Sequence, residues 1–421
     1  MYTTTIKRFI RRFNFKRKYN NEEIKLIYFY KKLFKLIKDD NEESLCNELI
    51  KYIEMLNYKG KHFDTEEKAY ITKTIKIIFQ KNKKKYEINK VSSSINIISL
   101  SGFGYSGTGA IHDFLRDIKN TIDVLKGREL DLFKYQYSLY SLYLRSISNR
   151  KNISEKDLNK FLFNHFFGLP YPGGVTQDEI NNRLVGSKSL LNAVLRLPQG
   201  KERVKLIKDI CIFANNISDL NKFNNSKEKL ELISKNLINN FGEYYKSKYP
   251  KKEYIILNNW ITASSINMVN LLPSESTIII CTRDALDAFY SWYSECPRIK
   301  FNLKIFVFPY VFLYFIRHID FSRNYRLICK ERLEKVHFIY FEEFVFKTSK
   351  KNGDLFYKNL FKLVSSEKSN FLKFNPNKSK NNVNIFLKNS KFRFFKISSL
   401  TFNSILYTIL RLLGCWNYRK N

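Results

Sequence analysis

The chain has 421 residues, of which 44% are hydrophobic and 16% aromatic, so it can bury a large core and wholesale disorder is excluded. Its formal net charge of +35 points to an anionic partner: a nucleotide, a polyanionic sugar, a membrane surface or a nucleic acid. Lys, Asn and Ile are abundant along the whole chain, which leaves open that much of this charge is a solvated surface of compositional origin.

The spacing of cysteines and histidines and the length of the apolar runs indicate which kinds of protein this chain is not expected to be. The six cysteines and five histidines are widely spaced, so we expect reduced thiols and neither a disulfide scaffold nor a metal site. Residues 1–20 lack the continuous apolar stretch of a secretory signal, and the longest apolar run, residues 305–316, is too short to span a membrane. We therefore expect a cytoplasmic protein, with peripheral contact at the inner face of an anionic membrane as an open alternative.

Residues 1–92 are predicted to form a basic, helical N-terminal extension. Within it, Ile6, Phe9 and Phe13 share one helical face while basic side chains occupy the other, a pattern typical of a helix at a membrane surface. Helical spacing of apolar residues returns over residues 45–56 and again further on. A charged run followed by serines then indicates a linker.

An α/β unit begins after this linker. A β-like apolar run at residues 95–100 leads into a glycine-rich turn, Ser101-Gly-Phe-Gly-Tyr-Ser-Gly-Thr-Gly109, and then into apolar residues at helical spacing. Strand, glycine loop and helix form the first unit of a phosphate-binding α/β fold, in which backbone amides point at one anion. Thr108 and Gly109 stand where the ATP- and GTP-binding motif has Lys and Ser or Thr, so that chemistry is poorly supported.

The rest of the chain completes this fold class. Residues 120–250 are predicted to be a helical insertion in a core domain that covers residues 93–390. Three further strands are predicted, at residues 253–257, 277–282 and 336–341. Their alternation with helices predicts an α/β, P-loop-like architecture with a parallel sheet flanked by helices. Residues 391–421 form a basic and aromatic C-terminal tail, suited either to a helix packed on the core or to contact with a membrane.

A second anion-binding element is predicted where the strand at residues 277–282 ends. Arg283 follows this strand, and Ser291 lies two turns into the next helix. A guanidinium offers two parallel donors and the hydroxyl a third, so the pair is suited to one phosphate. An Arg that ends a strand is more often in a surface ion pair, but beside the glycine loop it predicts a second phosphate clamp on one sheet edge.

These segments resemble the family of PAPS-dependent sulfotransferases, in its bacterial carbohydrate type, where PAPS is 3′-phosphoadenosine 5′-phosphosulfate. Gly104-Tyr-Ser-Gly-Thr-Gly109 takes the place of the loop that holds the 5′-phosphosulfate, and Arg283 with Ser291 has the spacing of the element that holds the 3′-phosphate. Residues 336–344 are similar to the family's strand followed by Tyr-Glu-Asp-Leu. Residues 374–383 are more weakly similar to its Phe-Asp-Pro segment. The four motifs follow the family's order along the chain.

The resemblance implies that the chain moves a sulfuryl group from PAPS to a hydroxyl of a glycan or glycolipid, for cell-envelope polysaccharide synthesis. PAPS is the implied co-substrate, without a metal, and the helical insertion is expected to shape the acceptor site. The implied PAPS-binding residues are Gly104, Tyr105, Ser106, Gly107, Thr108, Gly109, Arg283 and Ser291.

Two further positions concern catalysis. Glu129 matches the family's general base, which removes the hydroxyl proton as the oxygen attacks sulfur; a surface pair with a neighbouring Lys or Arg is the alternative. Tyr105 stands where the family normally has a cation that stabilises charge on the bridging oxygen, and Lys188 is a candidate to replace it. The alternative function is a catalytically weak or inactive PAPS-, nucleotide- or glycan-binding protein on the same fold. Nucleic-acid binding is not expected, because no recognition motif supports it.

Overall fold

The chain divides into two compact units, each with its own buried residues. One unit comprises residues 1–94, 128–244 and 271–273, and the other comprises residues 95–127, 245–270 and 274–421. The computed structural model describes residues 28, 32–33, 35–36, 39, 41–56, 64–79, 96–124, 139–148, 153–167, 190–195, 197–222, 225–295, 306–328, 330–348, 376–388 and 396–415. The amphipathic helix predicted at residues 6–13 and the linker before the first strand lie outside these ranges.

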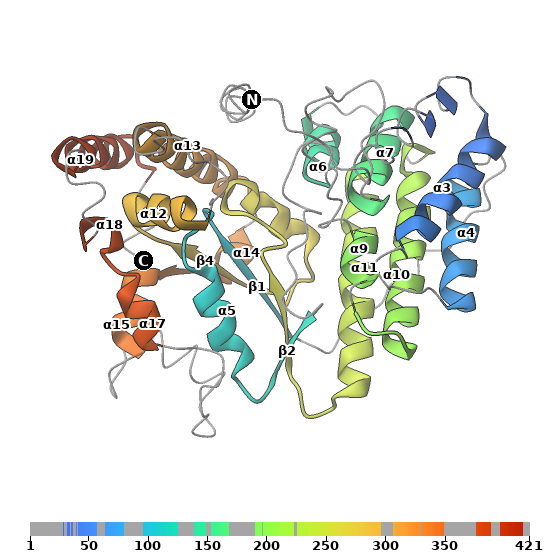
Figure 1. The fold of residues 1–421 in the computed structure, drawn as a ribbon, viewed down its shortest axis with the longest axis horizontal. Helices are drawn as coiled ribbons and strands as arrows, with labels where there is room; N and C mark the ends of the chain where they lie inside the picture. The colour runs from blue at the N-terminus through green and yellow to red at the C-terminus, as the bar shows by residue number, and fades with distance from the viewer. Residues whose placement is uncertain are drawn as a thin grey trace. The chain divides into compact units, whose positions relative to one another are not determined.

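The second unit is built on a five-stranded sheet in which all paired strands are parallel, in the order β2-β3-β1-β4-β5 (Figure 1). The strands are β1 (Asn96–Gly102), β2 (Thr121–Asp123), β3 (Tyr254–Asn258), β4 (Thr277–Thr282) and β5 (Val336–Tyr340). The predicted α/β class with a parallel sheet flanked by helices is confirmed. The four strands predicted from apolar runs are present within two residues of the expected bounds, whereas the short β2 was not predicted.

The apolar runs of the sequence correspond to strands that are buried on both faces. Ile97, Ile98 and Leu100 of β1 are at most 1% exposed, and residues 278–281 of β4 are fully buried. Parallel sheets carry helices on both faces, so their central strands are continuous in apolar residues rather than alternating. This is why β1 and β4 were recognisable in the sequence.

Helices cover both faces of this sheet. On one face, α5 and α15 share a buried cluster with the strands that includes Phe114, Phe344 and Ile98. On the other face, Phe321 of α13 packs edge-on against Phe338 of β5. The helices of this unit are α5 (Thr108–Arg116), η6 (Ala263–Leu271, whose last residue belongs to the first unit), α12 (Ala285–Glu295), α13 (Val307–Tyr325), α14 (Lys330–Leu333), α15 (Phe341–Thr348), α17 (Pro376–Asn381), α18 (Ile385–Lys388) and α19 (Lys396–Leu412).

Helix α5 is fastened to β2 through one buried carboxylate. Asp123 lies 2.8 Å from Arg116 Nε and 3.3 Å from His112 Nε2. His112 is only 4% exposed, so it is a structural residue that holds the first helix against the edge strand. Among the described residues of the whole chain, none of the helices combines the length and apolar character that crossing a bilayer requires.

The first unit is helical throughout its described residues. The N-terminal segment and the insertion, which were predicted as separate parts of the chain, pack together here through α4 and α10. The elements are α3 (Glu42–Leu56), α4 (Thr65–Phe79), α6 (Leu139–Ser148), α7 (Glu155–Phe161), η3 (Leu162–Phe167), α9 (Leu190–Leu195), α10 (Lys201–Ser218), η5 (Leu220–Lys222) and α11 (Ser226–Lys248, whose last turn belongs to the second unit).

A buried ion pair joins α4 to α10. Arg203 donates from Nε and Nη2 to the two carboxylate oxygens of Glu67, at 2.5 and 2.7 Å, and the residues are 2% and 0% exposed. The same carboxylate accepts from the Asp64 amide, and Asp64 accepts from the Glu67 amide, which completes a capping box at the start of α4. Glu67 therefore caps the start of α4 and also pairs with Arg203 of α10.

Replacing Glu67 by Ala leaves the Arg203 guanidinium buried without its counter-charge. We expect the free energy of unfolding to fall by about 3–5 kcal/mol. Denaturant titration of the full chain measures this loss. Glu66→Ala, on the exposed side of the same turn, is the matched control and should change stability by less than about 0.5 kcal/mol. A loss below about 1 kcal/mol for Glu67→Ala would contradict a buried, paired Glu67.

Candidate functional site

The loop after β1 has the backbone conformation of an anion-binding turn. Gly104 and Gly107 have φ of +83° and +89°, and Tyr105 between them has φ of +53°. Such left-handed residues turn neighbouring backbone amides toward one side of a loop. α5 then begins at Thr108, and its N-cap Gly107 gives no side-chain cap to the first helical amides. An anion placed there would accept these amides and face the positive end of the helix dipole.

Tight packing beneath the loop fixes this conformation. A Cβ atom on Gly102 would lie 2.2 Å from Ser106 Oγ and 2.6 Å from Thr108 Cγ2, so only glycine fits there. Ser106 is fully buried, and its carbonyl accepts from the Cys281 thiol at 2.8 Å. Burial raises the pKa of Cys281 above its usual range, which keeps this thiol a donor. The Ser106 hydroxyl therefore packs under the loop, and only the backbone of Ser106 is placed to serve a ligand.

The outer side of the loop is less tightly packed. Among the residues that the structure describes, no atom lies within 4 Å of a Cβ atom built on Gly109, and Tyr105 is 37% exposed. Asn259, which follows β3, has the left-handed conformation and donates from Nδ2 to Thr108 Oγ1 at 3.2 Å. The Thr108 hydroxyl is thus oriented by the residue after the neighbouring strand.

The aromatic ring of Phe341 connects the loop to Arg283. A Cβ atom on Gly107 would lie 2.1 Å from Phe341 Cδ2, so the ring occupies the space that a side chain at position 107 would fill. The Arg283 guanidinium carbon lies 4.7 Å from the centre of the same ring, within the range of a cation–π contact. The two predicted anion-binding elements therefore share one support at the carboxyl edge of the sheet.

Arg283 and Ser291 are brought together as their spacing suggested. Arg283 Nη1 donates to Ser291 Oγ at 2.8 Å, and Nη2 donates to the carbonyl of Asn382. Arg283 is only 5% exposed, and its Nε has no hydrogen-bond partner among the described residues. A buried donor without a partner is costly, and an incoming anion is one group that would satisfy it.

The segment at residues 376–388 is held against α12 by Asp287. The Asp287 carboxylate accepts from the amides of Asn384, at 2.7 Å, and Phe386, at 3.0 Å. Burial raises the pKa of Asp287 although these amides and Arg283 oppose the shift. This anchoring places the Asn382 carbonyl where it accepts from Arg283. The motif with the weakest resemblance, residues 374–383, therefore contributes one hydrogen-bond acceptor beside Arg283.

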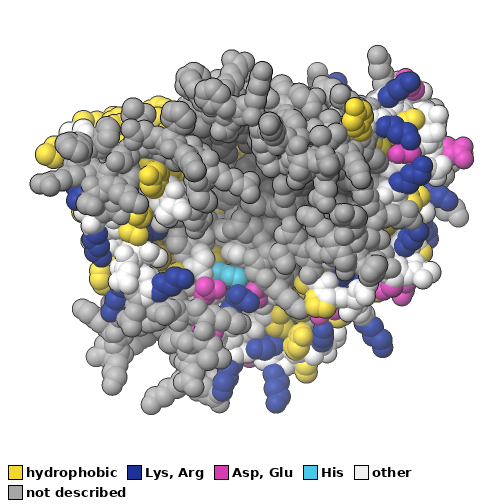
Figure 2. Space-filling view, viewed as in Figure 1, with side chains coloured by type: hydrophobic (Ala, Val, Ile, Leu, Met, Phe, Trp, Pro, Cys, Tyr) yellow, Lys and Arg dark blue, Asp and Glu magenta, His cyan; other side chains and the backbone are white. Residues whose placement is uncertain are grey.

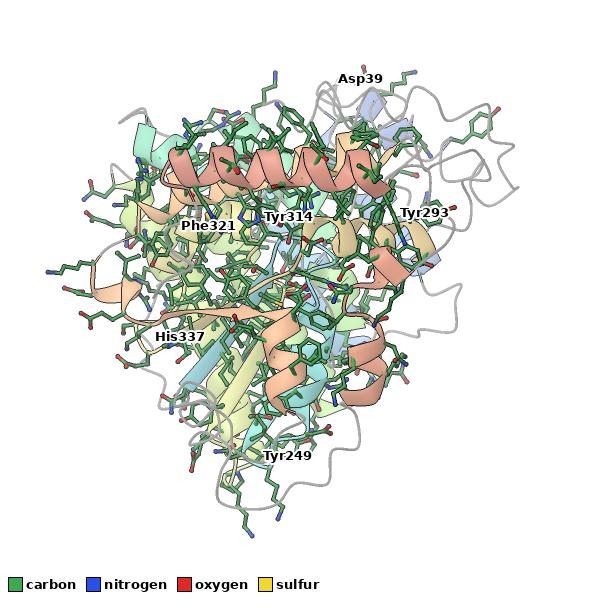
Figure 3. The ribbon with its side chains drawn as sticks, turned by 90° about the vertical axis from the view of Figure 1, so that its left-hand side faces the viewer. Asp39, Tyr249, Tyr293, Tyr314, Phe321 and His337 are labelled. Atoms are coloured by element: carbon green, nitrogen blue, oxygen red, sulfur yellow. The ribbon has the colours of Figure 1, made fainter. Side chains whose placement is uncertain are left out.

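Helix α13 contacts both elements. The Tyr314 hydroxyl accepts from the Arg283 amide at 3.3 Å and donates to the Arg283 carbonyl at 2.9 Å. One turn on, the His318 ring stacks on Phe103 of the loop with centroids 4.0 Å apart. Burial raises the pKa of Tyr314 well above its usual value, so this hydroxyl keeps its proton. Figure 3 labels Tyr314 and, on the same helix, Phe321.

Arg317 is a cation at the loop that the sequence did not reveal. Its Nη1 donates to the Phe103 carbonyl at 2.6 Å and lies 3.0 Å from the position of a Cβ atom on Gly104. The contact joins residues 214 positions apart, and nothing in the local sequence of α13 distinguishes Arg317 as a residue that contacts the loop. A positive charge is therefore held beside Tyr105, where the resemblance leads one to expect a cation.

The connections of the sheet place both elements where the strand order reverses direction. β1 and β4 are neighbours, but the chain leaves β1 toward β2 on one side and leaves β4 toward β5 on the other. In open parallel sheets, ligands bind outside the carboxyl ends of two such strands. The glycine loop follows β1 and Arg283 follows β4, so both elements stand at this point of the sheet.

Comparisons with protein-family models, with curated proteins and with solved structures found no match. The predicted base Glu129 and the candidate cation Lys188 lie outside the described residues. Within the ranges that the structure describes, no group of three His, Cys, Asp or Glu side chains is placed to hold a metal ion. The described site is thus an arrangement of backbone amides, hydroxyls and two guanidinium groups, which is chemistry suited to phosphate or sulfate esters.

The two glycines at the start of α5 should respond differently to substitution. Gly107→Ala places a methyl group against Phe341 and in a left-handed conformation, so we expect a loss of about 2–4 kcal/mol in the free energy of unfolding. Gly109→Ala faces open space and should raise stability by about 0.5–1 kcal/mol. Thermal unfolding of both variants beside the wild type measures the contrast, and equal effects would contradict the loop geometry.

Proposed function

We propose that this protein binds PAPS and transfers its sulfuryl group to a hydroxyl of a glycan or glycolipid. One observation carries the proposal: the glycine loop and the Arg283–Ser291 pair both stand against Phe341, at the ends of the adjacent strands β1 and β4. PAPS has a phosphosulfate at one end and a separate 3′-phosphate at the other. Amides at a helix start suit the first group, and a guanidinium with a hydroxyl suits the second.

In the proposed transfer of the sulfuryl group, the base and the loop amides have separate roles. The acceptor oxygen attacks sulfur, its proton passes to a carboxylate, and the bond from sulfur to the bridging oxygen breaks as 3′-phosphoadenosine 5′-phosphate (PAP) leaves. We assign Glu129 as the base. The amides of Gly107, Thr108 and Gly109, with the Thr108 hydroxyl, would hold the phosphosulfate as charge grows on the bridging oxygen. The acceptor class and a role in cell-envelope polysaccharide synthesis rest on the sequence resemblance, and the cytoplasmic setting rests on the widely spaced cysteines.

Arg317 is the group that we assign to the missing loop cation. A guanidinium has five N–H donors, and the hydrogen bond from Arg317 to the Phe103 carbonyl uses one of its terminal nitrogens. Its charge stands beside the loop at Gly104, next to the neutral Tyr105. A preorganised cation in a partly buried site stabilises developing negative charge more strongly than a tyrosine hydroxyl does.

Calorimetry with PAP tests the nucleotide site. We expect one molecule of PAP to bind per chain, and Arg283→Ala to weaken binding by about 10- to 100-fold because a charge-assisted contact to the 3′-phosphate is lost. Ser291→Ala should weaken it in the same direction with less effect on folding. Adenosine 5′-phosphosulfate, which lacks the 3′-phosphate, should bind the wild type and both variants equally. Arg326→Ala, exposed beyond the end of α13, is the charge-matched control. Unchanged PAP affinity in Arg283→Ala would refute the assignment.

Transfer of labelled sulfuryl from PAPS to a glycan pool tests Arg317. We expect Arg317→Gln to lower turnover by about 100- to 1,000-fold and PAP affinity by only a few-fold, because its charge acts on the transition state. Arg323→Gln, exposed on the same helix, serves as the control. Full turnover in Arg317→Gln would remove Arg317 from the mechanism.

If the wild type binds PAP without turnover, and Glu129→Gln changes nothing, the protein is a nucleotide-binding module on this fold.

A further inference from the structure

Helix α19 and the residue after it expose many large apolar side chains. Six large apolar residues of this segment are exposed: Ile397 (81%), Leu400 (40%), Ile405 (51%), Ile409 (37%), Leu412 (82%) and Leu413 (54%). The buried side of the helix holds Leu406 and Leu410 together with two polar residues, Ser399 and Asn403. A helix that only covers a core would bury more of its large apolar side chains, since burial of apolar surface is what holds it in place. The exposed face therefore calls for a partner of its own.

The exposure does not come from a loose helix. Asn403 Nδ2 donates to Asp284 Oδ2 at 3.3 Å, and the Tyr407 hydroxyl accepts from the Ala285 amide at 3.3 Å. Phe402 packs edge-on against Phe308 of α13, which places α19 firmly on its neighbour. Figure 3 views the molecule from this side, with α19 running across the front, and Figure 2 shows hydrophobic side chains at the edge where Figure 1 places this helix.

Charge identifies the kind of partner. Residues 368–421 contain eleven Lys and Arg residues and no Asp or Glu, within a chain of net charge +35. The exposed side chains of α19 include Arg411 and several Ser and Thr, with no acidic group. A second copy of the chain would oppose like charges at this face. An anionic lipid surface offers both an apolar layer and negative headgroups, which is what a basic interfacial helix requires.

We propose that α19 docks the protein on an anionic membrane surface, with its axis parallel to the bilayer and its exposed Ile and Leu side chains in the headgroup region. The helix has 17 residues and a length of about 25 Å, and its exposed Ile and Leu residues extend from Ile397, near its start, to Leu412 at its end. This inference is independent of the nucleotide site, because it uses neither Arg283 nor the glycine loop.

Vesicle sedimentation with the full chain tests the proposal. We expect the wild type to bind vesicles of phosphatidylcholine mixed with phosphatidylglycerol, and to bind vesicles of phosphatidylcholine alone more weakly. The double variant Ile397→Ser with Leu412→Ser should reduce binding to the anionic vesicles by at least about tenfold, since both side chains are more than 80% exposed and leave the core intact. Phe346→Ser with Ile147→Ser, on exposed positions of α15 and α6, is the matched control and should bind like the wild type.

Two outcomes would overturn the docking surface. The first is binding to anionic vesicles that the Ile397 and Leu412 substitutions leave unchanged, since charge alone would then explain it. The second is a dimer in sedimentation equilibrium that the same substitutions dissociate, without vesicle binding by the wild type. That result would assign the face to a second copy of the chain.

Discussion

The contact of Phe341 with both Gly107 and Arg283 is the constraint on which the site depends. The ring fills the space left by the absent side chain at position 107 and lies under the guanidinium. It follows directly after β5, so the ends of β1, β4 and β5 meet at one aromatic ring. Protein interiors are tightly packed, so a change in the size or position of any of these three residues shifts the other two. The two anion-binding elements are thereby held at a fixed separation before any ligand arrives.

Helix α13 supplies the second layer of this preorganisation. Tyr314 fixes the backbone of Arg283, His318 stacks on Phe103, and Arg317 binds the Phe103 carbonyl between them. Both elements are therefore supported by the same helix as well as by the same ring. A site held in this way does not have to reorganise when charge develops, which is the condition for strong electrostatic stabilisation.

Features of the fold and the site that depend on neighbouring residues could be predicted from the sequence, whereas features that depend on contacts between distant residues could not. β1 and β4 are buried runs, and Arg283 with Ser291 is a helical spacing, so local patterns predicted them. β2 has three residues, too few to show a period, and Arg317 meets the loop across 214 positions. The pairing of the N-terminal helices with the insertion likewise depends on a contact across 136 positions. The role of Glu129 stays a prediction, since it lies outside the described residues.

The polarity of α19 connects the proposed membrane surface to the proposed chemistry. Its inner side contacts Asp284 and Ala285, the two residues that follow Arg283, while its outer side exposes large Ile and Leu side chains. A bilayer bound to the outer side would therefore lie one helix diameter, about 10 Å, from the corner where β4 meets α12. Docking would hold the proposed nucleotide site near an acceptor that is anchored in the same bilayer, whereas a free glycan would gain nothing from the docking. Between the two acceptor classes, this arrangement favours a glycolipid.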